Sequence, residues 1–310
     1  MGTPEFSVVS LEKLLASKHQ VLGVVTQPDR PKGRGMKLAY SPVKTIALTH
    51  NLPVYQPESL PDEALMSFLK EVRPEAIVVV AYGLKIPPAI LDLPLYGCIN
   101  LHASLLPKYR GASPIQAVIL NGETTTGVTT MKMDEGWDTG DLLLTRTVAI
   151  GETETFGTLH DRLAAIGAAL LVETLDALEE GKITPQPQDH SAATYVRKLS
   201  PEDYILDWSH ETVSLYNRIR AFDPMPGART SLNGEPLKIW AARPGKGWYG
   251  LEAAVPGTIG ELVKEEEWAL PVRTGDGVLL LTELQLPGKK RLTIEQFAAG
   301  NTLTAGTVLG

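Results

Sequence analysis

Hydrophobic and polar positions divide the first two-thirds of the chain into two kinds of segment. Strand-like segments lie at 21–26, 76–81, 97–104, 126–133 and 142–150, and the first two are continuous apolar runs of the kind typical of buried strands. Apolar residues at helical spacing lie between these segments and predict helices that begin at Thr3-Pro4 and Ser41-Pro42 and that cover 63–72, 113–120 and 158–180. Strands that alternate with helices predict a doubly wound, Rossmann-like, mainly parallel sheet of the α/β class.

The pattern changes after residue 180. The stretch 181–203 contains closely spaced Pro and Gln residues, which is typical of a linker. A helix is predicted over 210–221, and five short strand-like runs follow it at 228–232, 236–242, 257–263, 269–274 and 277–286. Short strands at this spacing predict a small OB-like β-barrel. We therefore expect a first domain over 1–180, a linker over 181–203 and a C-terminal domain over 204–310.

Composition narrows the class of protein. The 310 residues include 29 Lys and Arg against 36 Asp and Glu, and the net charge of −7 argues against non-specific coating of nucleic acid. No apolar run approaches the roughly 18 residues of a membrane span, and the N-terminus lacks the pattern of a secretory signal. The single cysteine, Cys98, cannot form an internal disulfide, which fits a reducing compartment. We therefore expect a cytoplasmic protein that does not bind membranes.

Positive charge is concentrated in two segments despite the negative net charge. Residues 30–44 contain no acid and hold five basic residues, which are Arg30, Lys32, Arg34, Lys37 and Lys44. Residues 217–250 hold six basic residues against two acids, whereas 151–180 is strongly acidic. The average charge therefore hides local basic surfaces that an anionic partner could meet.

Two polar clusters carry the candidate chemistry. Asn100 and His102 lie two positions apart on a predicted strand, so both side chains face the same side near its carboxyl end. The turn over 134–141 follows, with two glycines and several carboxylates. An amide, an imidazole and a carboxylate suit acyl transfer to an amine, because this reaction needs an oxyanion donor, a proton-transfer group and a tuning charge. Taken singly, either cluster is more often structural.

Other motifs are better explained by structure. The remaining histidines have no zinc-ligand spacing, so no metal site is expected. The run from Gly245 to Gly250 fits G-x-G-x-x-G, but it lies in the β-rich half without a βαβ unit, which predicts an ordinary loop. Cys98 is most simply a small buried hydrophobe.

Residues 97–143 closely resemble the core of the folate-dependent formyltransferases. That family combines an N-x-H strand, a Ser-Leu-Leu-Pro segment and an Asp within a D-x-G-x-D-T-G-D loop, and all three motifs occur here without gaps. The resemblance implies 10-formyltetrahydrofolate as the formyl donor, no metal, and catalysis by Asn100, His102 and Asp138. It also implies that one segment lines the folate site, namely Ser104, Leu105, Leu106 and Pro107.

The basic loop and the C-terminal half resemble, within that family, the members that formylate methionyl initiator tRNA. The matching segments are 26–35, 41–44, 219–224, 256–259, 275–277 and 305–310. The resemblance implies formyl transfer to the α-amine of methionine on that tRNA, for translation initiation, by a monomer. The tRNA contacts that it implies are Arg34, Lys32 and Lys37 in the loop and Arg218 and Arg220 in the C-terminal half. Further phosphate contacts are expected from Arg229, Lys238, Arg243, Lys246 and 289–291.

The chain departs from the family pattern at its start. Members normally open with a short apolar strand before the Gly-Thr-Pro turn, whereas Met1 here directly precedes Gly2. We therefore expect a central strand to be missing, its neighbours to expose unpaired backbone, and part of the support of the folate pocket to be lost. A start assigned too late, or a shortened chain, explains this better than a working protein without the strand.

Three other functions remain open from the sequence. A formyltransferase for a small amine, such as a nucleotide sugar or a purine precursor, would keep 97–143 without needing the basic loop. A hydrolase that releases formate from the same folate would keep the same three polar residues. An RNA-binding protein on an inactive scaffold is the least favoured, because Asn100, His102 and Asp138 are all intact.

Overall fold

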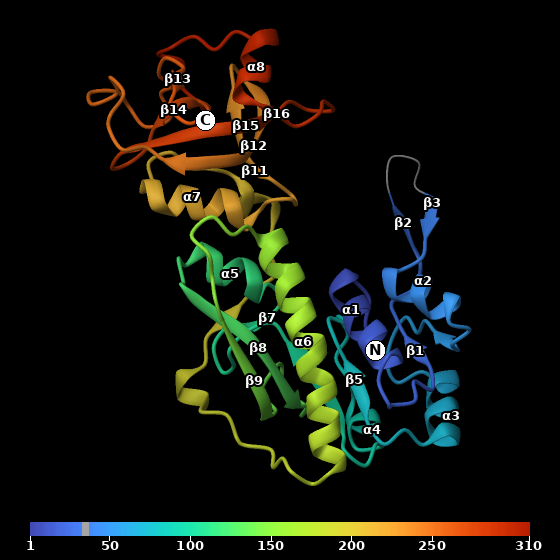
Figure 1. The fold of residues 1–310 in the computed structure, drawn as a ribbon. Helices are drawn as coiled ribbons and strands as arrows, with labels where there is room; N and C mark the ends of the chain where they lie inside the picture. The colour runs from blue at the N-terminus through green and yellow to red at the C-terminus, as the bar shows by residue number, and fades with distance from the viewer. Residues whose placement is uncertain (33–36) are drawn as a thin grey trace. The chain divides into compact units, whose positions relative to one another are not determined.

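The expected alternation of helices and strands is present in the computed structural model, which describes residues 1–32 and 37–310 (Figure 1). The chain forms two units that are interleaved along the sequence. The first unit contains 1–114, 125–149 and 160–197, and the second contains 115–124, 150–159 and 198–310. The polar residues predicted for catalysis all belong to the first unit.

The helices of the first unit begin and end close to their expected positions, except α4, which was not predicted. Their bounds are α1 Glu5–Leu15, α2 Pro42–Thr49, α3 Glu63–Val72, α4 Pro88–Leu91 and most of α6 Phe156–Glu179. The α3 helix begins where Asp62 caps it, since its carboxylate accepts from the Leu65 amide at 2.9 Å. The α1 helix was predicted to begin with Thr3 as N-cap and Pro4 as its first residue, but it begins one residue later: Pro4 is its N-cap, and the Thr3 hydroxyl accepts from the Gln27 amide at 3.3 Å.

The main sheet of the first unit has the order β5-β6-β8-β9, with bounds β5 Ile77–Val79, β6 Cys98–His102, β8 Thr125–Lys132 and β9 Asp141–Ala149. The β5–β6 pair is parallel, as is a separate pair of β1 Val24–Val25 with β4 Val54–Tyr55. The β6–β8 and β8–β9 pairs are antiparallel. The β8–β9 connection is the loop 133–140, which is too short for the crossover that parallel strands require.

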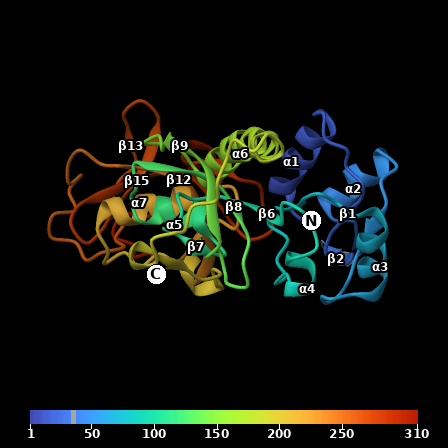
Figure 2. The ribbon, with the colours of Figure 1, turned by 90° about the horizontal axis from the view of Figure 1, so that it is seen from below.

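The two faces of β6 contact different helices. Leu101 packs against α6 at Gly167, where an added Cβ would lie 2.8 Å from the leucine side chain. The Cys98 thiol instead donates to the Ile90 carbonyl in α4 at 3.7 Å, so the cysteine is buried as expected. Figure 2 shows α4 and α6 on opposite sides of the sheet. Because side chains alternate along a strand, Asn100 and His102 share the face of Cys98.

Among the described residues, no strand lies between β1 and β5. A cavity of about 480 Å³ lies there, lined by 20–25 from one side and 72–78 from the other. Met1 and Gly2 bridge the two strands: the Gly2 amide donates to the Val25 carbonyl at 3.0 Å, and the Met1 carbonyl accepts from the Val80 amide at 2.9 Å. The rest of each facing strand edge has no strand partner in the described chain.

Two short strand pairs complete the first unit. The β2 Arg30–Lys32 and β3 Lys37–Ala39 strands form an antiparallel pair. The β7 Arg110–Gly111 strand pairs in parallel with β10 Tyr195–Val196. The stretch predicted as a linker therefore contributes a strand to the first unit, together with a 3-10 turn at His190–Ala192.

The second unit contains an antiparallel sheet with the order β11-β12-β15-β14-β13, and β16 pairs with β15. The bounds are β11 Ala228–Leu232, β12 Glu235–Pro244, β13 Val263–Lys264, β14 Trp268–Arg273, β15 Val278–Gln285 and β16 Leu292–Thr293. The helices are α5 Pro114–Leu120, of which all but the first residue belongs here, α7 Thr212–Ala221 and α8 Ile294–Gly300, with a 3-10 turn at Pro201–Tyr204. Phe222, Leu281 and Phe297 lie in its core. The expected loop at 245–250 follows β12.

Candidate active site

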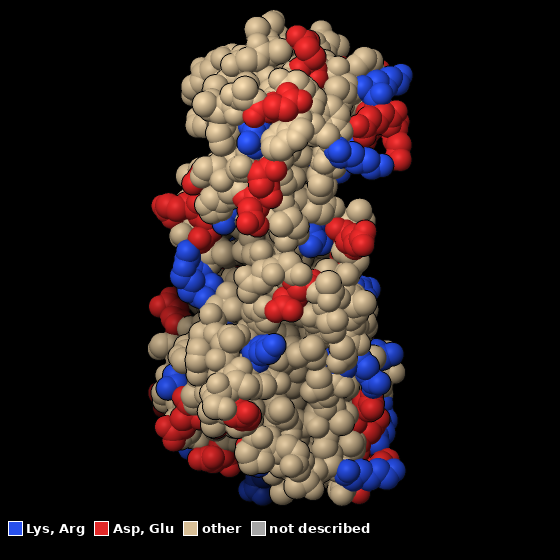
Figure 3. Space-filling model, turned by 90° about the vertical axis from the view of Figure 1, so that its left-hand side faces the viewer, with Lys and Arg blue, Asp and Glu red and all other residues tan. Residues whose placement is uncertain are grey.

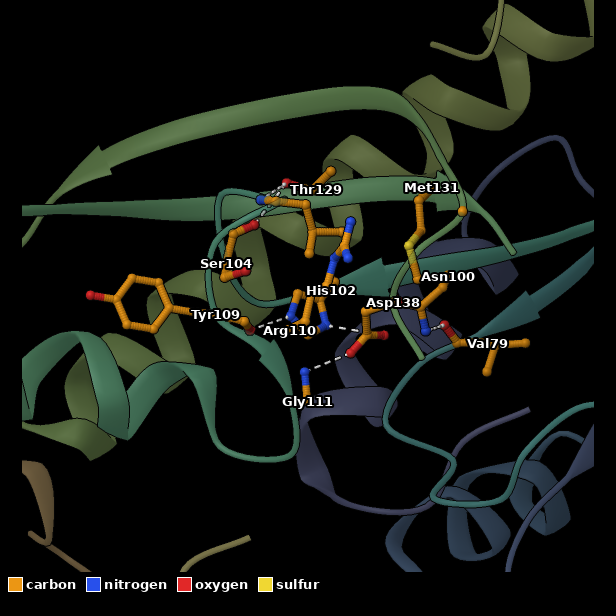
Figure 4. Close-up of polar contacts among 12 residues, drawn as sticks. Val79, Asn100, His102, Ser104, Tyr109, Arg110, Gly111, Thr129, Met131 and Asp138 are labelled. Atoms are coloured by element: carbon orange, nitrogen blue, oxygen red, sulfur yellow. Dashed lines mark hydrogen bonds and ion pairs between the residues drawn. The ribbon is translucent and has the colours of Figure 1, made fainter. Parts of the chain in front are cut away.

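Asn100 and His102 lie at the carboxyl end of β6, on one face of the sheet, as their spacing predicted (Figure 4). The Asn100 amide nitrogen donates to the carbonyl of Val79 on the neighbouring strand at 3.2 Å. Its Oδ1 is buried and has no hydrogen-bond partner in the part of the chain that the structure describes. A buried polar atom without a partner is costly, so this oxygen is available to a bound ligand.

The His102 ring is held from both of its nitrogens. Only 6% of the residue is exposed, and Nε2 lies 2.9 Å from the Tyr109 carbonyl oxygen. Because a carbonyl can only accept, Nε2 must carry a hydrogen, and Nδ1 is the nitrogen that gains or loses a proton. Nδ1 lies 3.6 Å from Asp138 Oδ1, which is close enough for an ion pair and too long for a direct hydrogen bond.

Asp138 is the carboxylate of the acidic turn that reaches His102. Its second oxygen accepts from the Gly111 amide at 2.8 Å, and its backbone φ of +55° is left-handed. Such a conformation costs about 1–3 kcal/mol outside glycine and persists only where neighbours enforce it. Asp134 instead stabilises the turn, since its Oδ1 accepts from the Gly136 amide at 2.9 Å and the Thr139 hydroxyl at 2.6 Å.

Arg110 and Gln188 lie behind this group, and sequence reasoning missed both. Only 1% of Arg110 and 5% of Gln188 is exposed. The Gln188 Oε1 accepts from Arg110 Nη2 at 2.7 Å, and its Nε2 donates to the carbonyl of Asp138 at 2.9 Å. Arg110 lies in a turn-rich segment of the sequence, and Gln188 lies in the predicted linker. The two are 78 positions apart, so no local sequence pattern relates them.

The segment predicted to line the folate site forms a tight turn beside His102. The Ser104 hydroxyl donates to the Lys108 carbonyl at 2.7 Å, and the Ser104 carbonyl accepts from the Thr129 hydroxyl at 2.7 Å. Ser104 and Leu106 are buried, whereas Leu105 and Pro107 are half-buried. The polar groups of Ser104 are therefore used within the protein, and folate contact by this segment stays a prediction.

The residues predicted to contact tRNA differ in how they are placed. Arg34 lies outside the described residues, as do the side chains of Lys32 and Lys37. Arg218 is half-buried and donates to the Asp203 carbonyl. Arg220 is buried and donates to Asn217 Oδ1 at 2.9 Å, to the Gly151 carbonyl at 3.2 Å and to the Glu154 carbonyl at 3.0 Å. This arrangement gives Arg220 a structural role and lends no support to RNA contact.

Comparison with known proteins identifies the family. The family described as Formyl transferase matches residues 1–175, and its C-terminal domain matches 198–302. The chain belongs to the formyl transferase family. Its relatives include the methionyl-tRNA formyltransferase of Pelobacter propionicus, which is 48% identical over the whole chain and 95% of the relative. The methionyl-tRNA formyltransferase of Syntrophus aciditrophicus is 46% identical over the whole chain and 97% of its own length.

The fold also has solved counterparts. The N-formyltransferase of Helicobacter canadensis, solved with folinic acid and dTDP-3-aminofucose, superposes with a TM-score of 0.60 at 19% identity. The alignment covers 90% of this chain and 96% of that one. At this identity the likeness concerns the fold alone. Among the helices that the structure describes, none is long and apolar enough to cross a membrane.

Proposed function

We propose that the protein transfers the formyl group of 10-formyltetrahydrofolate to the α-amino group of methionyl initiator tRNA. The observation that carries this proposal is the 46–48% identity to methionyl-tRNA formyltransferases, which extends over all 310 residues and so includes the C-terminal unit. The grouping of Asn100, His102 and Asp138 supplies the donor, the proton-transfer group and the carboxylate that the reaction requires.

The reaction begins when the neutral amine of the methionyl group attacks the formyl carbon. A carbon–nitrogen bond forms, and negative charge develops on the formyl oxygen. The Asn100 amide has one hydrogen bonded to Val79 and a second that can be donated to this oxygen. Its unpartnered Oδ1 can accept from an N–H of the attacking amine. We assign both contacts to Asn100, since they stabilise the transition state and orient the nucleophile.

The second step transfers protons while the bond to the folate nitrogen breaks. His102 Nδ1 is the ring nitrogen free to exchange a proton, because Nε2 is bonded to Tyr109. Before transfer, the Asp138 carboxylate, 3.6 Å from Nδ1, stabilises the charged ring; it then accepts the proton that the amine loses, and passing that proton to Nδ1 restores the starting state. The proton on Nδ1 passes to the leaving folate nitrogen, and the formyl group stays on the amine.

His102→Ala and Asp138→Asn test this assignment. Each should lower the single-turnover rate of formyl transfer by about 10²–10³, because a positioned donor or base is removed while the fold is kept. Rapid-quench measurement of formylated methionyl-tRNA gives the rate, and fluorescence titration gives folate affinity, which should stay within about threefold. Single-turnover rates near that of the unchanged protein would contradict the assignment.

The acceptor is tested separately from the chemistry. The protein is offered 10-formyltetrahydrofolate with charged initiator tRNA, with a nucleotide-sugar amine, or with buffer alone, and the formyl group is followed. We expect transfer to the tRNA only. Transfer to the sugar amine, or release of formate in buffer, would favour one of the alternative activities. The likeness to the Helicobacter canadensis N-formyltransferase supports a common fold and does not support either activity.

The C-terminal half is proposed to bind tRNA, with 1–180 as the catalytic domain, 181–203 as a linker and 204–310 as the tRNA-binding domain. Several basic side chains here are engaged within the protein: Arg243 pairs with Glu265 at 2.6 Å, and Lys238 donates to Pro226 at 2.7 Å. Lys289 and Lys290 are exposed and make no ion pair in the described part of the chain. We expect these two, with Arg34, Lys32 and Lys37, to contact phosphates, and the enzyme to act as a cytoplasmic monomer.

A further inference from the structure

Arg110 is a buried cation whose partners, within the described parts of the chain, include no carboxylate. Its guanidinium donates to Gln188 Oε1 at 2.7 and 3.2 Å and to the Tyr195 hydroxyl at 3.0 Å, and it lies 3.1 Å from His190 Nδ1. A buried charge without an opposite charge is expensive even when it is hydrogen-bonded. Its position therefore needs an explanation other than fold stability.

Gln188 connects Arg110 to the loop that carries Asp138. Its Nε2 donates to the carbonyls of Asp138 at 2.9 Å and Gly140 at 2.7 Å, while Oε1 faces Arg110. A guanidinium can only donate, so Arg110 fixes which end of the amide faces it and turns the Nε2 end toward the loop. The two side chains act as one device, in which Arg110 orients Gln188 and Gln188 holds the loop.

Arg110 and Gln188 also lie next to the two groups that contact the His102 ring. The acceptor at Nε2 is the carbonyl of Tyr109, and the carboxylate at Nδ1 is that of Asp138. Both residues have left-handed backbone, with φ of +59° and +55°, so neither contact would hold its place without support. Arg110 directly follows Tyr109 in the chain, and it reaches Asp138 through Gln188.

The support also includes the backbone of the next residue. The Gly111 amide donates to Asp138 Oδ2 at 2.8 Å, and an added Cβ at this position would lie 2.2 Å from the Val196 carbonyl oxygen. Arg110 and Gly111 form β7, which pairs with β10 at Tyr195 and Val196. Figure 4 shows Tyr109, Arg110 and Gly111 as a continuous stretch beside His102 and Asp138.

We propose that Arg110 and Gln188 are positioning residues for the formyl transfer, which hold the Tyr109 carbonyl and the Asp138 carboxylate at the two nitrogens of His102. This inference rests on the proposed function, because it assumes that His102 and Asp138 take part in the reaction. A displacement of about 1 Å in such a group can lower a rate by about 10²-fold.

Gln188→Glu keeps the contact with Arg110 and removes the two hydrogen bonds to the loop that carries Asp138. The new carboxylate has almost the shape of the amide and pairs with Arg110, so the fold should be retained. It cannot donate to the carbonyls of Asp138 and Gly140, so the loop is no longer held. We expect kcat to fall about 10–100-fold, with the KM for folate and for charged tRNA within about twofold. The control is Gln186→Glu, an exposed glutamine in the same segment, which should leave kcat unchanged.

A double-mutant cycle with Asp138→Asn provides the decisive readout. If Gln188 acts through Asp138, Gln188→Glu should lower kcat by less than about threefold in the Asp138→Asn background. An equal decrease in both backgrounds would mean a general structural role and would overturn the inference while leaving the catalytic assignment intact. An Asp138→Asn variant as active as the unchanged protein would instead overturn the proposed role of Asp138, and this inference with it.

Arg110→Lys provides a second variant. Lysine keeps the charge but cannot form the planar, two-nitrogen contact with Gln188, so the orientation of the amide is no longer fixed. The same fall in kcat at unchanged KM, again absent in the Asp138→Asn background, is expected. Circular dichroism melting establishes that each variant is folded. A folded Arg110→Lys variant with unchanged kcat would count against Arg110 as part of the device.

Discussion

The hydrogen on one ring nitrogen decides what His102 can do. The Tyr109 carbonyl requires a hydrogen on Nε2, so any proton that the ring exchanges must pass through Nδ1, which faces Asp138. The identities of His102 and Asp138 could be predicted from their motifs, and so could their convergence. The tautomer could not, because it depends on a backbone carbonyl seven residues further along the chain that no motif specifies.

Arg220 offers a test at the same scale, because the sequence predicted RNA contact whereas the structure gives it a structural role. Arg220→Met removes the donors that Asn217, Gly151 and Glu154 accept from. We expect the free energy of unfolding to fall by about 2–4 kcal/mol, since the buried Asn217 side chain and two backbone carbonyls lose a charged donor that is itself buried. Urea denaturation measures the decrease, and the KM for charged tRNA of the folded variant should be unchanged.

The matched control is Arg229→Met, which removes an exposed arginine from the same unit. Its free energy of unfolding should change by no more than about 0.5 kcal/mol, as for most surface substitutions. A rise in the KM for tRNA with Arg220→Met at unchanged stability would restore the original expectation for this residue.

At the scale of elements, local chemistry predicted most boundaries. The α3 helix follows its expected range because Asp62 caps its start and Arg73 adopts a left-handed conformation at its end. The predicted extent of an element was wrong where residues distant in the sequence determine that element. The expected strand over 21–26 is reduced to Val24–Val25, which pairs on one side with β4 within the described residues. The expected linker contains Gln188, whose burial depends on Arg110.

In the 310-residue chain, the α-amino group of Met1 lies between β1 and β5. It donates to the Val78 carbonyl at 2.6 Å, and burial lowers its pKa from 8.0 to about 6. Between these values the unfolded chain binds more protons than the folded chain, so stability rises with pH from about 6 to about 8. The two-unit difference corresponds to about 2–3 kcal/mol.

We therefore predict that adding a five-residue apolar strand, such as Val-Ile-Val-Ile-Val, before Met1 removes this dependence and raises stability. The strand replaces the buried amine by a peptide, pairs with the edges of β1 and β5, and places apolar side chains in the cavity between them. Urea denaturation of both chains at pH 6, 7 and 8 provides the comparison, with a Gly-Ser extension of equal length as the control. Equal pH dependence in the unextended and apolar-extended chains would contradict the prediction.

At the scale of the whole molecule, the net charge of −7 describes the surface poorly. On the face drawn in Figure 3, Lys and Arg side chains are interspersed with Asp and Glu side chains. The net charge suggested no affinity for nucleic acid, whereas the relatives that match the whole chain are enzymes named for a tRNA. An average charge excludes non-specific coating and does not exclude a local contact with one RNA.

Lys289 and Lys290 allow this contact to be tested. Replacing both by alanine should raise the KM for charged tRNA. In a plot of the logarithm of kcat/KM against the logarithm of salt concentration, the slope should become less negative by about 0.7–0.9 for each phosphate that is no longer bound. Folate binding should be unaffected. Lys70→Ala, an exposed lysine of the first unit, is the control. An unchanged salt dependence in the double variant would place the phosphate contacts elsewhere.

The separation of Arg110 from Gln188 has a consequence for the order in which the protein is made. Gln188 follows Arg110 by 78 positions. At a synthesis rate of roughly 5–20 residues per second, Gln188 is therefore added about 4–16 seconds after Arg110. A ribosome-bound chain that ends before residue 188 therefore carries Asn100, His102 and Asp138 without the amide that holds their loop. The site reaches its geometry only after the last segment of the first unit has emerged. The three polar residues are therefore synthesised before the chain can hold them in the arrangement that formyl transfer requires.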